Sequence, residues 1–254
     1  MVKIFMYELR RMLLSKLFVA LAVINGVFAW YVLSSEIVAG VAFTAPFSVW
    51  SFGYYLATVM SMAMMTALFL LSNYYSKKER QVEVLTSATP VDAAKYILIR
   101  NAVVTLGFVL LCFVAIVLSV FFYASVFGYR DFAVFIVPAI VTIVPGFVFF
   151  MGLGHLAGSI RPWLLYVLIP VALAIGFMQT PGVLDFFGGG YFSLTPLTLP
   201  VGADGEPAFV LNAAFLLTRA AYLVLGGVLW VISIKRKQMA ISLRFEVRTS
   251  PKMP

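Results

Sequence analysis

The chain has 254 residues, of which 63% are hydrophobic and only 11% are charged, and its mean hydropathy is +1.04. A soluble domain carries about a quarter charged residues, so this composition excludes a soluble fold. The formal net charge of +8 comes from basic residues that are dispersed and flank apolar stretches. This distribution favours contact with membrane lipids and argues against a nucleic-acid partner.

The first sixteen residues predict an amphipathic helix that lies in the membrane interface. Apolar side chains recur at spacings of three and four residues, and Lys3, Tyr7, Arg10 and Arg11 occupy the other face. Such a helix places its apolar face in lipid and its basic face toward the headgroups. It serves either as a topogenic anchor or as an elbow that also contacts a cytoplasmic partner.

Six long apolar stretches each reach or approach the ~20 residues that a helix needs to cross the hydrocarbon core. Backbone polar groups cannot stay unpaired in lipid, so these stretches are expected to be helices. They cover residues 17–33, 50–73, 97–123, 132–156, 163–179 and 211–234. The expected fold is an all-α polytopic membrane protein, with six transmembrane helices in one domain (1–238) and a short basic tail (239–254).

Lysine and arginine lie almost entirely on one side of these spans. If the N-terminus is cytoplasmic, sixteen of the eighteen basic residues lie on the inner side, which leaves Arg130 outside and Arg219 within the last span. The outer loops carry the acidic residues Glu36, Asp131, Asp185, Asp204 and Glu206. The positive-inside rule therefore predicts two cytoplasmic termini, in a multi-pass protein of a prokaryotic plasma (inner) membrane.

The loop over residues 76–103, between the second and third spans, holds much of the charge of the chain. Its first half alternates charged side chains with apolar ones, which fits a short helix across the inner membrane face. Thr89 is a good N-cap, Pro90 suits the first helical position, and Asp92 stands where a capping-box acid belongs. The loop is either a rigid knob or a solvated charge cluster that only enforces topology.

This loop resembles the intracellular coupling loop of ABC-2 type transporter permeases. The matching positions are Glu79, Val84, Leu85, the Ala88-Thr89-Pro90-Val91 turn and Arg100. The six expected spans, the amphipathic first helix and the extended loop before the last span also match, so the resemblance covers residues 1–238. Many members carry a Gly-Thr-Leu element where this chain reads Gln81-Val82-Glu83-Val84-Leu85.

The resemblance implies the transmembrane (permease) subunit of an ATP-driven ABC-2 type exporter, which forms half of the translocation path. It implies two copies of a separate ATP-binding subunit, which hold ATP and Mg, and a second permease subunit, either the same chain or a homologue. The contacts with the ATPase are then expected at Glu79, Arg80, Glu83, Val84 and Leu85. The alternative is a membrane scaffold, sensor or assembly subunit that transports nothing.

The chain itself contains no G-x-x-x-x-G-K-[ST] phosphate loop, and its cytoplasmic segments are too short to fold an ATPase domain. We therefore expect that it is not an enzyme and binds no cofactor of its own. Its spans also offer only isolated polar residues, whereas an intramembrane enzyme needs clustered acids, bases or nucleophiles.

Five polar or aromatic residues are candidates for a substrate path: Asn25, Ser51, Tyr54, Tyr55 and Arg219. In ABC-2 permeases the first, second and fifth spans line the route, and the first four of these residues lie on the first two spans. The alternative role for such residues is helix packing.

Arg219 and His155 lie well inside the expected spans, where a charge is costly, whereas Arg100 stands near the start of the third span. We expect Arg219 to snorkel to the outer interface or to pair with an outer acid such as Asp204 or Glu206; recognition of an anionic substrate group is the alternative. His155 has no Cys, Asp or Glu at ligand spacing, so we expect a structural hydrogen bond and no metal site.

The outer loop over residues 180–210 contains a triple glycine, four prolines and a rather apolar run. ABC-2 permeases have short re-entrant helices at this place, which cap the exit. The loop is expected to dip back into the outer leaflet, and an ordinary external loop is the alternative.

Overall fold

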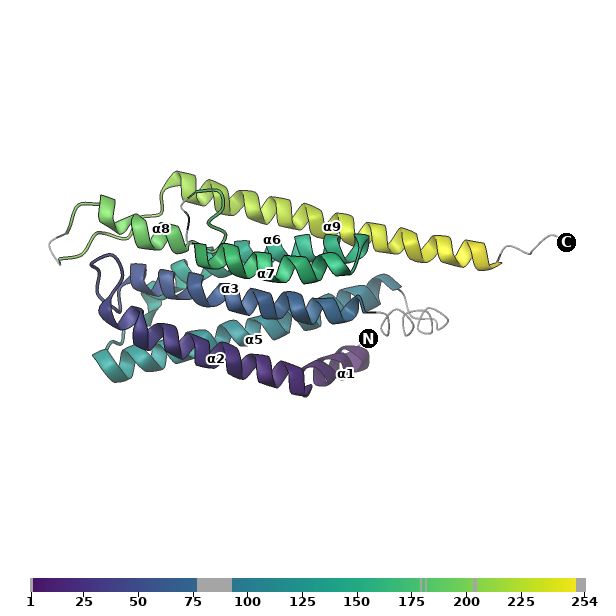
Figure 1. Ribbon diagram of the computed structural model, residues 1–254, viewed down its shortest axis with the longest axis horizontal. Helices are drawn as coiled ribbons and strands as arrows, with labels where there is room; N and C mark the ends of the chain where they lie inside the picture. Colours follow the sequence, from purple (N-terminus) through teal and green to yellow (C-terminus); the bar gives the residue numbers. More distant parts are fainter. Residues whose placement is uncertain (1, 77–92, 179, 181, 203–204, 250–254) are drawn as a thin grey trace.

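The computed structural model describes residues 2–76, 93–178, 180, 182–202 and 205–249. This part of the chain is a helical bundle without β-strands, which confirms the all-α class. Figure 1 shows the long helices side by side along one axis. α1 and the C-terminal end of α9 lie at one end of the bundle, called the basic end below, and α8 lies at the other, the capped end.

Among the described residues, five helices are long and apolar enough to cross a membrane. They are α2 (Lys16–Ser35), α3 (Val49–Tyr74), α5 (Ala93–Phe127), α6 (Ile136–Ile160) and α9 (Ala213–Thr249). The fifth expected span is a shorter apolar helix, α7 (Trp163–Met178), of 16 residues. At ~1.5 Å per residue α7 measures ~24 Å, which is less than the ~30 Å of the hydrocarbon core.

A single serine forms the elbow between α1 (Val2–Leu13) and α2. The Ser15 hydroxyl donates to the carbonyl oxygen of Met12 at 2.7 Å and accepts from the amide of Phe18 at 3.1 Å. The same side chain therefore gives the Met12 carbonyl, which also accepts from the Ser15 amide, a second hydrogen bond, and it satisfies an unpaired N–H at the start of α2.

The apolar stripe of α1 is divided between the bundle and the exterior. Met12 is buried with Leu70 of α3 and Val103 of α5, whereas Val2 and Met6 remain exposed. The sequence predicts an apolar face that lies in lipid. The structure instead uses the last turn of that face to attach α1 to the bundle.

The helix α3 is the centre of the bundle. The share of its apolar segment that is buried is 83%, against 22% for α9. The Ser48 hydroxyl caps it by accepting from the amide of Ser51 at 3.1 Å. In Figure 1 it lies between α2 and α7.

The helices α6 and α9 cross with their backbones in contact. A Cβ atom added at Gly152 would lie 2.2 Å from the carbonyl oxygen of Gly226, and one added at Gly226 would lie 2.5 Å from backbone atoms of Val148 and Phe149. Small residues allow this close approach, which is the usual way in which membrane helices gain packing energy. Beyond the crossing, α9 continues as one helix to Thr249, past the expected domain boundary at residue 238.

Candidate functional site

The residues expected to contact an ATPase, namely Glu79, Arg80, Glu83, Val84 and Leu85, lie outside the described residues. The structure does describe where their loop leaves and rejoins the bundle. It leaves after α3, whose C-cap is Tyr75, and it rejoins at the start of α5.

A polar and aromatic cluster joins three helices at this place. The Arg100 guanidinium lies over the rings of Tyr74 and Tyr96, with its carbon 4.3 Å and 5.2 Å from the two ring centroids. The Tyr96 hydroxyl donates to Glu8 at 3.3 Å, and Glu8 forms a salt bridge with Arg11 at 3.0 Å. The cluster therefore attaches α1 to α3 and α5 where the loop begins. Glu8 is 4% exposed, and its sequence context gives no sign of this role.

At the capped end a cavity of about 540 Å³ opens between the α2–α3 connection, α3, α7 and α8 (Gly189–Leu194). Polar and apolar residues line this capped-end cavity: Glu36, Gly40, Val41, Ala42, Tyr54, Thr58, Phe177 and Ser193. Tyr54 is the one candidate for the substrate path, among the five named from the sequence, that lines it. Its hydroxyl donates to the Glu36 carboxylate at 3.4 Å.

The cavity wall formed by residues 40–48 is held in place by hydrogen bonds. Ser51, a predicted path residue, is fully buried; its hydroxyl accepts from the amide of Val41 at 3.1 Å and pairs with Thr44 at 3.1 Å. The Glu206 carboxylate accepts from the amide of Ala45 at 2.6 Å. Ser51 thus positions the wall and does not itself line the cavity.

Two consecutive residues of this wall have left-handed backbone angles. Ala42 has a φ of 52° and Phe43 a φ of 61°, and the Phe43 side chain is 96% exposed. Residues other than glycine rarely take this conformation, and when they do they cluster at functional sites. Alanine and phenylalanine give no sign of a left-handed backbone in the sequence, so the sequence does not predict these two positions as part of a site.

Two further predicted path residues serve helix packing. The Asn25 amide donates to the Thr66 hydroxyl and to the carbonyl oxygen of Leu21, each at 2.8 Å. The Tyr55 hydroxyl donates to the carbonyl oxygen of Ala115 at 2.8 Å. Both side chains are buried within the chain and join α2 to α3 and α3 to α5.

The helix α7 ends before it reaches the capped end. Gly176 packs directly on Ser61, since an added Cβ would lie 2.2 Å from the Ser61 Cβ. Ser61 stands 12 residues, or ~18 Å, after the first residue of α3, and α7 ends two residues beyond Gly176. The end of α7 therefore lies roughly 15 Å short of the first residue of α3. Figure 1 shows α7 stopping short of the end of α3, with α8 beyond it.

The segment after α7 fills this gap and packs deep in the bundle. Phe186 stacks on Phe149 with ring centroids 5.1 Å apart, and Phe187 stacks on Phe150 at 5.6 Å. Phe149 lies 13 residues, or ~20 Å, below the first residue of α6. The following stretch up to Phe192 is buried as well. This packing favours the re-entrant alternative over an ordinary external loop.

Arg219 of α9 holds the re-entrant segment and is only 3% exposed. Its guanidinium donates to the carbonyl oxygen of Phe186 and lies over the Phe215 ring at 4.3 Å from the centroid. The expected snorkelling is therefore wrong, because the protein covers the side chain. The nearby acid is Asp185, whereas the Glu206 carboxylate accepts from the amide of Ala45 and Asp204 lies outside the described residues.

Asp185 caps α8 with both carboxylate oxygens. They accept from the amides of Gly188 and Tyr191, each at 2.8 Å. Burial raises the pKa of this carboxyl above its usual value, and the amides together with Arg219 oppose that rise. The pairing was missed because Asp185 and Arg219 stand 34 residues apart and meet only through the fold.

His155 has the structural surroundings that its sequence context predicts. Its Nδ1 atom lies 3.1 Å from the hydroxyl of Tyr75, and its ring stacks on Trp230 with centroids 5.5 Å apart. Among the described residues, no three His, Cys, Asp or Glu side chains gather as a metal site would require.

Comparisons of the chain with models of protein families, with curated proteins and with solved structures found no match. The ABC-2 resemblance therefore depends on the residues of the coupling loop and on the pattern of spans.

Proposed function

We propose that this chain is the transmembrane subunit of an ATP-driven ABC-2 type exporter. It forms half of a translocation path, and a separate ATP-binding subunit docks on the loop between α3 and α5. ATP and Mg belong to that partner. The proposal places the chain in a prokaryotic plasma (inner) membrane, with α7 as a short sixth span and with the basic end in the cytoplasm.

The observation that carries the proposal is one accessible stripe along the otherwise buried α3. Its side chains that are not fully buried include Tyr54, Met62, Met65, Phe69 and Asn73, which share one face of the helix. The stripe starts at the capped-end cavity and continues to the basic end. Exposure to lipid also leaves such a face, but this one begins at a cavity with polar lining residues, which favours a helix that lines a route.

The charges at the two ends support the proposed orientation. At the basic end, Lys16 begins α2, Lys95 lies in the first turn of α5 and Arg161 follows α6. At the capped end, Glu36 follows α2, and Asp131 precedes α6 together with one basic residue, Arg130. Positive residues stay on the cytoplasmic side of a membrane protein, which makes the basic end the inner one.

A second permease subunit would complete the path. The Phe28 ring of α2 contacts the Phe177 ring of α7, with centroids 5.9 Å apart, so these two helices meet beside the stripe. A chain of the same kind placed against α2 and α7 would enclose the stripe. We propose that the second subunit is either a second copy or a homologue. A scaffold or sensor subunit, the alternative function, needs neither the stripe nor the cavity.

Reversing Glu79 and Glu83 to lysine is expected to uncouple ATP hydrolysis by the partner from motion of the bundle, without loss of membrane insertion. Ser193 lines the capped-end cavity, and Cys112 is the only native cysteine and is buried. A Ser193→Cys chain in complex with its ATPase can therefore be labelled from outside with an impermeant maleimide. ATP should change the labelling rate, and the charge reversals should abolish that change.

Asp131→Lys is the control, because it makes the same carboxylate-to-lysine reversal, at one position, in an exposed loop at the capped end. It should leave the effect of ATP intact. If the Glu79→Lys, Glu83→Lys chain kept the full effect of ATP on labelling, the coupling role of the loop would be refuted.

A further inference from the structure

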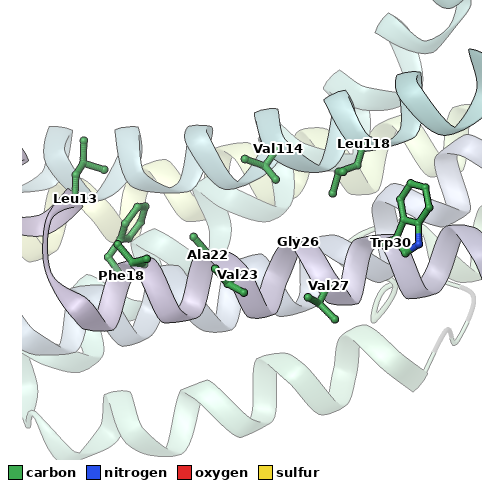
Figure 2. Close-up of a pocket in the computed structure, with 10 residues that line it drawn as sticks. Leu13, Phe18, Ala22, Val23, Gly26, Val27, Trp30, Val114 and Leu118 are labelled. Carbon is green, nitrogen blue, oxygen red and sulfur yellow. The ribbon is translucent and has the colours of Figure 1, made fainter.

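An apolar groove of about 590 Å³ runs between α2 and α5. Figure 2 shows it with Leu13 and Phe18 near one end and Trp30 near the other, and with Val114 and Leu118 of α5 on its far wall. Among the described side chains that line it, the indole nitrogen of Trp30 is the only polar atom. A ligand for this groove must therefore be a hydrocarbon.

Small residues on α2 leave this space open. A Cβ added at Gly26 would have its nearest neighbour, the Cγ1 atom of Val114, at 3.9 Å. Gly152 and Gly176, in contrast, would place a Cβ 2.2 Å from the neighbouring helix. Gly26 thus does not serve the close backbone packing seen at Gly152, and it leaves room on α2 for an atom in ordinary van der Waals contact with Val114.

The groove is closed at the end nearer the capped end. The Trp30 ring packs against Phe121 and Phe122 of α5, with centroids 6.4 Å and 5.7 Å apart. From Phe18 to Trp30 the groove measures ~18 Å, which is close to the ~15 Å of one leaflet of the hydrocarbon core. A membrane-spanning helix of another subunit would be too long for the groove, because the Trp30 ring would block its path. An acyl chain as long as one leaflet can end at Trp30.

The open end of the groove lies beside a basic elbow. Leu13 and Phe18 line that end, and between them Lys16 is the first residue of α2 and is exposed. Arg10, three residues before Leu13, is exposed as well. Exposed basic side chains at this level attract an anionic lipid headgroup.

We propose that the groove between α2 and α5 binds one acyl chain of an anionic phospholipid from the leaflet at the basic end, with its headgroup at Lys16. The lipid fills the space between two helices that otherwise meet only partly. It also touches α1 through Leu13, so its binding stabilises the elbow. The proposal is independent of the transport function.

The test is native mass spectrometry of the purified full-length chain with added phosphatidylglycerol. Gly26→Leu fills the groove and is expected to remove one tightly bound phosphatidylglycerol per chain. Gly227→Leu is the matched control: it makes the same change in α9 at a site with no atom within 4 Å, so its lipid count should equal that of the unchanged chain.

A second variant tests the headgroup. Lys16→Gln is expected to lower the preference for phosphatidylglycerol over phosphatidylcholine by about fivefold, as befits the loss of one basic residue near an anionic lipid. Because this position is exposed, the fold is not at risk.

Two results would overturn the proposal. One is an unchanged count of bound phosphatidylglycerol in Gly26→Leu, together with an unchanged lipid preference in Lys16→Gln. The other is a Gly26→Leu chain that keeps its lipid but dissociates from a dimer to a monomer, which would make the groove a contact between subunits.

Discussion

Replacing Gly152 with valine is expected to destabilise the bundle more than any other single change in α6. The new Cβ would lie 2.2 Å from the carbonyl oxygen of Gly226, which is a backbone atom and cannot rotate away. The helices α6 and α9 would have to separate along their whole contact. Overpacking of this kind typically costs about 1–3 kcal/mol, and a backbone clash lies at the upper end of that range. The measurement is the thermal unfolding midpoint of the purified chain.

Gly227→Val provides the control. Gly227 is the neighbour of Gly226 on α9, and no atom would lie within 4 Å of its added Cβ. Both variants carry the same cost of a β-branched residue in a helix. The difference between their unfolding midpoints therefore reports the contact between α6 and α9 alone. Equal midpoints for the two variants would contradict the close crossing of α6 and α9.

Arg219→Met is expected to detach the re-entrant segment from α9. Methionine keeps the length of the side chain but loses the hydrogen bond to the Phe186 carbonyl and the contact of the guanidinium with the Phe215 ring. A hydrogen bond from a charged group contributes about 1.5–3 kcal/mol. The change also leaves Asp185 buried without its cation, which raises the pKa of Asp185 further. Faster proteolysis between α7 and α9 is the expected result.

The raised pKa of Asp185 gives this variant a pH dependence. The folded state binds the proton of Asp185 more tightly than the unfolded state does, so stability is present at low pH and is lost as the pH rises through the folded pKa. Relative to the unchanged chain, Arg219→Met should therefore lose stability progressively as the pH rises from the ordinary pKa of this carboxyl, 3.8, towards its raised pKa in the folded state.

Asp185→Asn tests the origin of that dependence. Added to Arg219→Met, this second change should remove the pH dependence. The double variant should lose less free energy of unfolding than the two single variants lose in sum. A strictly additive result would show that Asp185 and Arg219 do not act on each other.

The sequence predicts the long helices closely because length and hydropathy are local properties. The second span, expected at 50–73, is the helix Val49–Tyr74, and the elbow after α1 lies where the apolar period changes. Hydropathy does not report depth, however. It therefore could not show that α7 stops short of the capped end and that Phe186 and Phe187 take its place.

The candidate site was harder to predict because tertiary contacts decide it. Asn25, Ser51 and Tyr55 look like path residues in the sequence, but the amide nitrogen of Asn25 and the hydroxyls of Ser51 and Tyr55 bond to partners within the chain. Tyr54 differs from Tyr55 only by the 100° turn between successive helix positions, and that turn places it in the capped-end cavity. The partner of Arg219 depends in the same way on the fold of the whole outer segment.

The central claim, that the chain is a half-permease, is tested most directly by purification of the tagged chain from its native membrane in mild detergent. Every protein that accompanies it is identified and its amount measured. We predict a stoichiometric ATP-binding subunit that is lost when residues 77–88 are altered. A chain that reproducibly purifies without any ATPase would contradict the proposal and would favour the scaffold or sensor function.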